Sequence, residues 1–149
     1  MARARRSFKL RLSPAGLDVL IDSHCHVIRV TRSLIAWGTT LHVAVEHLDT
    51  FPTVDIVGKL QALELDHLGG AEEHHVGASN RLRDTATRIT ERVQMGSTDG
   101  RQPNLGTIYL LALLQITKAD EVDLMDAYGR ALQSGARHPA SRDDHDLAS

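Results

Sequence analysis

Apolar and polar side chains alternate near the start of the chain, and this alternation predicts a β-strand over residues 7–12. One face of the strand holds the apolar side chains of Phe8, Leu10 and Leu12. The other face holds the polar and basic side chains of Ser7, Lys9 and Arg11. No second strand of this quality follows within hairpin distance, and a lone strand leaves its backbone groups unpaired. We therefore expect the strand to pair with a distant segment or with another copy of the chain.

The pattern after the strand predicts helices. Ser13 and Pro14 are typical of a helix start, and apolar residues recur at helical spacing as far as about Val27. Thr31 or Ser33 then opens a second helix that runs towards residue 45. Further helices are expected over residues 54–68, 71–95 and 106–116, and from a cap at Thr117 to Ser134. The predicted fold class is therefore mainly α, and the apolar helix 106–116 should be the most buried.

Turn residues and composition divide the chain into three parts. Pro52 lies in a connection over residues 49–53, which places a boundary after a first module of residues 1–48. Residues 49–135 form a helical extension in this interpretation. The polar tail, residues 136–149, is expected to be disordered.

Charge is distributed unevenly between the two ends of the chain. Residues 1–36 contain seven Lys or Arg and two acidic residues, which gives this part a net charge of +5. The whole chain has a net charge of −2, so the remaining residues have a net charge of −7. A basic end of this kind favours contact with a polyanion. The single cysteine, Cys25, fits a reducing, cytoplasmic compartment, and the apolar run 108–116 is too short to cross a bilayer. We expect no membrane partner.

Residues 7–45 resemble the ribbon-helix-helix family of DNA-binding proteins. The resemblance rests on the alternating strand, on the Ser13-Pro14 helix start, and on the segment 31–35 that opens the second helix. It implies a homodimer, or a higher oligomer, in which two chains pair their strands into a ribbon that enters the DNA major groove. The chain departs from the family pattern at His24, at Gly38 and in the turn 27–30.

The same resemblance assigns roles to individual residues. Ser7, Lys9 and Arg11 would contact the bases of double-stranded DNA. Arg32 and Ser33, at the start of the second helix, would bind a phosphate, and Arg5 and Arg6 would follow the DNA backbone. The implied function is that of a transcriptional repressor, or of an accessory factor in plasmid mobilisation or partition, with residues 54–134 available to a protein partner. No cofactor is implied.

Histidine and glutamate residues support a second interpretation, a helical metal-binding protein or metalloenzyme with a divalent metal. Glu64 and His67 are three residues apart, as are Glu72 and His75. On a helix, such spacing places a carboxylate and an imidazole on one face.

Histidines also occur in the segment 20–26, which resembles the metal-binding strand of metal-dependent amidohydrolases. His24 and His26 point the same way only if this segment is extended. No arrangement typical of a nucleophilic enzyme or of a phosphate-binding loop accompanies Cys25 or the glycines. A helical assembly protein that binds neither nucleic acid nor metal is the remaining class.

Overall fold

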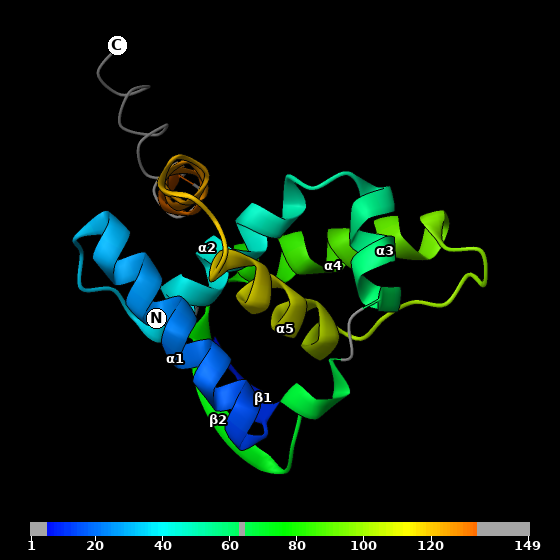
Figure 1. Ribbon diagram of the computed structural model, residues 1–149, viewed down its shortest axis with the longest axis horizontal. Coiled ribbons are helices and arrows are strands. Elements are labelled where there is room, and N and C mark those ends of the chain that lie inside the picture. The colour runs from blue at the N-terminus through cyan, green and yellow to red at the C-terminus, as the bar shows by residue number, and fades with distance from the viewer. Residues whose placement is uncertain (1–5, 63–64, 134–149) are drawn as a thin grey trace, which may run out of the picture.

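Helices make up most of the protein, and two strands form one small antiparallel sheet (Figure 1). The computed structural model describes residues 6–62 and 65–133. In chain order the elements are β1 (Arg6–Leu12), α1 (Pro14–Thr31), α2 (Trp37–Asp49), α3 (Thr53–Ala62), the 3-10 turn η1 (Asp66–Leu68), β2 (Glu72–Ala78), α4 (Asn80–Gly96) and α5 (Leu105–Ile116). Residues 121–133 form one more helix. The prediction of a mainly helical fold is confirmed.

The strand and helix predicted at the start of the chain are both present. Leu10 and Leu12 of β1 are buried, and Ser13 accepts a hydrogen bond from the backbone N–H of Gly16, which caps α1. Pro14 occupies the first turn of that helix. The helix extends one turn beyond the predicted end at Val27 and ends at Thr31, since no glycine or proline interrupts the segment after Val27.

The partner of β1 comes from a distant part of the same chain. β2 pairs with β1 antiparallel, from Arg6 opposite Ala78 to Leu12 opposite Glu72. A helix predicted over residues 71–95 is therefore wrong for residues 72–78, and α4 begins only at Asn80, where Ser79 caps it. Of the two partners expected for the strand, the structure contains the distant segment.

The core of the protein lies between α2 and α5, which cross in the middle of the molecule (Figure 1). Every residue of α2 from Thr40 to Leu48 is buried, and α5 is buried along most of its length, as predicted. α4 and α1 pack against this pair, and the sheet closes one end of the core beneath α1. One hydrophobic cluster includes side chains from β1 through to residue 131.

Two glycines let helices approach the backbone of other elements very closely. A Cβ atom at Gly38, in the first turn of α2, would overlap the carbonyl oxygen of Gly77 in β2. A Cβ at Gly16 in α1 would overlap the carbonyl oxygen of Leu68 in η1. Gly38, a departure from the ribbon-helix-helix pattern, is thus the residue that brings α2 against the sheet.

Several helix ends differ from the predicted ones. α3 is described as far as Ala62, and among the described residues 65–68 the helix expected over 54–68 is replaced by the short turn η1. Thr117 ends α5 instead of opening the next helix. Asp120 takes the capping role, because its carboxylate accepts a hydrogen bond from the backbone N–H of Asp123. The predicted tail 136–149 lies outside the described residues.

Candidate functional site

One face of the β1–β2 ribbon presents charged side chains to solvent. Residues opposite one another in an antiparallel pair share a face, so Lys9 lies beside His75 and Arg11 beside Glu73. The side chains of Lys9 and Arg11 are 53% and 65% exposed. Leu10, on the opposite face, is buried. The predicted division of the strand into an apolar and a basic face is confirmed for these residues.

The remaining candidate residues of this face are described only in part. Ser7 lies opposite Gly77, and Arg6 lies opposite Ala78. Arg5 lies outside the described residues, and so do the side chains of Arg6, Ser7 and Phe8. Their predicted roles stay predictions.

A single carboxylate partly neutralises the two cations of the ribbon. Glu73 Oε2 lies 3.1 Å from Nη2 of Arg11, and its Oε1 lies 3.7 Å from Nζ of Lys9. Exposed ion pairs of this kind contribute at most about 1 kcal/mol. Both cations can therefore exchange Glu73 for another anion at little cost.

A cleft of about 370 Å³ lies beside this basic strand. It is lined by Lys9 and Arg11 on one side, by residues near η1, and by Gly106 and Thr107 in the first turn of α5. The positive end of the α5 dipole thus faces the same space as the two cations. Asn104 caps this helix, because its side chain accepts a hydrogen bond from the Thr107 backbone N–H at 2.8 Å.

Arg32 and Ser33 do not begin the second helix, so the predicted helix-terminal phosphate site is wrong at these positions. Arg32 ends α1 in a left-handed conformation with φ 56°, and its N–H donates to Ile28 O at 2.8 Å. Ser33 donates to the carbonyl oxygen of Thr31. α2 starts four residues later, at Trp37. Because α1 continues past Val27, the turn between the two helices is displaced towards the C-terminus.

The proposed metal-binding residues do not share a helical face. Glu72 and His75 lie in β2, where residues three apart point to opposite faces. His67 lies exposed in η1, and Glu64 lies outside the described residues. Glu72 instead contacts His74, with Oε1 and Nε2 3.4 Å apart. Within residues 6–62 and 65–133, no three His, Cys, Asp or Glu side chains are grouped to hold a metal ion.

The histidines of segment 20–26 connect α1 to its neighbours. Nδ1 of His24 lies 2.6 Å from Oγ1 of Thr40, and its ring stacks on Trp37 at 3.9 Å between centroids. Nε2 of His26 lies 2.9 Å from the carbonyl oxygen of Ala119. The segment is helical, so the extended geometry of the amidohydrolase strand is absent here.

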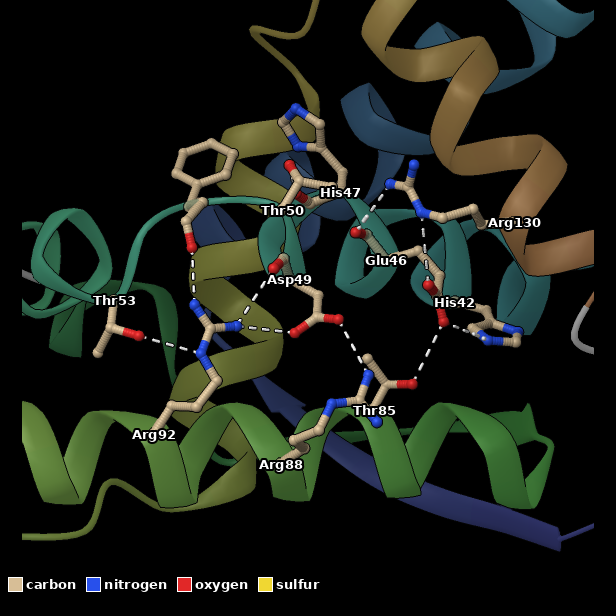
Figure 2. A network of polar contacts seen from close by, with 11 residues as sticks. His42, Glu46, His47, Asp49, Thr50, Thr53, Thr85, Arg88, Arg92 and Arg130 are labelled. Atoms are coloured by element: carbon tan, nitrogen blue, oxygen red, sulfur yellow. Dashed lines mark hydrogen bonds and ion pairs between the residues drawn. The ribbon is translucent and has the colours of Figure 1, made fainter.

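A polar network around Glu46 was not predicted from the sequence (Figure 2). This buried carboxylate accepts a hydrogen bond from Thr85 at 3.2 Å and lies 3.3 Å from Nε2 of His42. Arg130 donates to the backbone oxygen of Glu46 at 3.1 Å. Burial acts to raise the pKa of Glu46, but His42, Thr85 and Arg130 together hold the pKa below its usual range. Glu46 is thus a satisfied charge that joins α2, α4 and helix 121–133.

A second part of the network closes the C-terminal end of α2 (Figure 2). The guanidinium of Arg92 donates to the backbone oxygens of Asp49 and Phe51 at 3.2 and 2.7 Å. It also donates to the Asp49 carboxylate at 2.8 Å and to Oγ1 of Thr53 at 3.0 Å. Arg88 contacts the other oxygen of Asp49. These contacts fix the turn between α2 and α3, which indicates a structural role.

No protein-family model, curated protein or solved structure matches this chain. Among the described residues, no helix is both long and apolar enough to span a bilayer.

Proposed function

We propose that this protein binds double-stranded DNA through the solvent-facing side of the β1–β2 ribbon. The observation that supports the proposal is the exposure of Lys9 and Arg11, two residues apart on one face of a two-stranded antiparallel ribbon. A ribbon of this width fits the major groove, where Lys and Arg can donate to O6 and N7 of guanine. Arginines of the N-terminal segment, Arg5 and Arg6 among them, would bind phosphates.

The proposed ribbon differs from that of the ribbon-helix-helix family in its origin. In that family two chains each supply one strand, whereas here β1 and β2 belong to one chain. One copy of the protein would therefore present a complete ribbon. Sequence-specific binding, as in a repressor or a plasmid mobilisation or partition factor, is the function class that this surface fits, and a homodimer would place two ribbons on one DNA site.

Loss of the two basic side chains tests this proposal. A pool of random duplexes is first enriched by repeated selection on the wild-type protein, and affinity for the selected duplex is measured over a salt series. We expect Lys9→Ala with Arg11→Ala to weaken binding by about 10-fold or more and to flatten the salt dependence. A matched control, Arg101→Ala with Lys118→Ala, removes the same charge from exposed positions outside the ribbon.

A second variant, which removes a negative charge from the ribbon at Glu73, is expected to have the opposite effect on DNA affinity. Glu73→Gln removes the carboxylate that contacts both cations, so we expect this variant to bind the selected duplex more tightly than wild type. If the Lys9/Arg11 variant binds as wild type does, or if the control pair loses as much affinity, the ribbon is not the DNA-binding surface.

A further inference from the structure

The helix formed by residues 121–133 is apolar on two sides. Its inner side is built by Leu124, Ala127 and Ala131, which are buried in the core. Its outer side presents Val122, Met125 and Leu132, which are 78%, 44% and 48% exposed. A helix that only covers a core needs the first of these sides and not the second.

The outer side has the spacing of a helix-pairing seam. Positions 122, 125, 129 and 132 are separated alternately by three and four residues, which is the repeat by which two helices pack their side chains together. Gly129 occupies one of these positions, and a Cβ atom there would meet nothing within 4 Å. No side chain of the described residues therefore fills the surface at position 129 of the seam.

We propose that this seam, formed by Val122, Met125, Gly129 and Leu132, pairs antiparallel with the same seam of a second copy of the chain. A twofold axis on the outer side of the helix, level with position 127, would bring Val122 opposite Leu132 of the second copy. It would also bring Met125 opposite Gly129 of the second copy, so that a long side chain fills the space left by a residue without one. The seam is thus complementary to itself in the antiparallel direction.

The distribution of charged residues along this helix also favours antiparallel pairing. Asp120 caps this helix, and Glu121, Asp123 and Asp126 lie in its first half, whereas the basic residue Arg130 lies in the second half. Parallel pairing would set the acidic halves side by side. Antiparallel pairing about position 127 separates the two copies of Glu121 by about 18 Å along the helix, which exceeds the screening length of about 8 Å at physiological salt. Asp126 lies close to the axis, and its charge is offset by an ion pair with Arg130 of its own chain.

The small area of the seam limits the expected affinity of the dimer. Stable interfaces bury about 800 Å² on each partner, more than three exposed apolar side chains on one short helix provide. We therefore expect a dimer that dissociates on dilution. The inference does not depend on DNA binding, and its test contains no DNA.

Sedimentation velocity over a concentration series tests the seam. Wild type should shift from monomer to dimer as concentration rises, and Met125→Lys, which places a charge in the seam, should stay monomeric. Gly129→Leu should also stay monomeric, because the new side chain would overlap Met125 of the second copy. Gly58→Leu is the matched control, since Gly58 is an exposed glycine of α3 with nothing within 4 Å of its Cβ position, and it should dimerise as wild type does.

Cysteine cross-linking tests the direction. In a Cys25→Ser background, which removes the native exposed thiol, Val122→Cys and Leu132→Cys are placed on separate chains. Antiparallel pairing gives a disulfide-linked dimer when the two proteins are mixed and little with either alone. A wild type that is monomeric throughout, a dimer that survives Met125→Lys, or cross-linking of Val122→Cys to itself would overturn the proposal.

Discussion

Gly38 determines how closely α2 approaches the sheet. Its missing side chain leaves room for the carbonyl oxygen of Gly77, a backbone atom that cannot rotate away. We expect Gly38→Ala to lower the free energy of unfolding by about 2 kcal/mol, because the cost of overpacking exceeds the roughly 1 kcal/mol that alanine gains in a helix. Urea unfolding monitored by circular dichroism measures the difference.

Gly58 provides the control for this prediction. It lies in α3, where an added Cβ meets nothing within 4 Å. Gly58→Ala should therefore raise the unfolding free energy by up to about 1 kcal/mol through helix propensity alone. If both alanine variants change stability in the same direction, the close approach of α2 to β2 is not what requires glycine at position 38.

At the scale of elements, Arg92 joins the end of α2 to the start of α3. Its guanidinium makes four hydrogen bonds there, two of them to backbone oxygens that no helix bond satisfies. We expect Arg92→Ala to lower the unfolding free energy by about 2–4 kcal/mol, since hydrogen bonds to charged groups contribute about 1.5–3 kcal/mol. Arg92→Lys should recover only part of this loss, because an ammonium cannot reproduce the planar fork of donors.

Arg88 is the matched control on the same helix. It also contacts the Asp49 carboxylate, but its side chain is 56% exposed and it makes no contact with the turn backbone. Arg88→Ala should cost less than about 1 kcal/mol in the same urea titration. Equal losses for the two arginine variants would contradict the capping role of Arg92.

Local signals explain which elements the sequence predicts well. The alternation in β1, the Ser13-Pro14 start of α1 and the apolar run of α5 each depend on residues a few positions apart. β2 has no such signal, because its acidic residues and histidines are poor strand formers. Its partner lies more than fifty residues earlier, and the one cue in the sequence is that Glu73 complements the charges of Lys9 and Arg11.

In the candidate site, as in the fold, the sequence predicts the features that depend on neighbouring residues and not those that depend on distant ones. The two faces of β1 follow from its alternation, and the exposure of Lys9 and Arg11 agrees with it. Arg32 and Ser33 do not start the second helix because α1 continues to Thr31, and no glycine or proline marks the end of α1 in the sequence. In the Glu46 network only the contact with His42, four residues earlier on the same helix, has a local pattern. The other contacts of the Glu46 and Arg92 networks join residues 39 to 84 positions apart, which no local pattern encodes.

At the scale of the whole molecule, buried histidines make stability depend on pH. Burial lowers the pKa of His24 and of His47 from 6.5; Arg130 lowers that of His47 further, and Asp123 opposes the change. Below pH 6.5 the unfolded chain takes up protons that the folded chain does not. The unfolding free energy should therefore be fully retained above this pH and should fall as pH drops through the lowered values.

Urea unfolding at a series of pH values from about 7.5 to 5 measures this dependence. His47→Leu should flatten it, because the variant lacks one of the two histidines whose pKa is lowered. Nδ1 of His47 has no hydrogen-bond partner among the described residues, so the substitution breaks no bond at this atom. His75→Gln, at an exposed position of β2, leaves His24 and His47 in place and should keep the wild-type slope. An unchanged slope in His47→Leu would contradict the prediction.

The pairing of β1 with β2 also has a consequence for protein synthesis. Leu12 leaves the ribosome 60 residues before its partner Glu72, a delay of about 3–12 seconds at ordinary elongation rates. During that interval β1 is an unpaired edge that another nascent chain could join. We expect the like charges of Lys9 and Arg11 to disfavour pairing with the same strand of a neighbouring chain until Glu73 is synthesised. The two cations proposed to contact DNA would then also limit aggregation during synthesis.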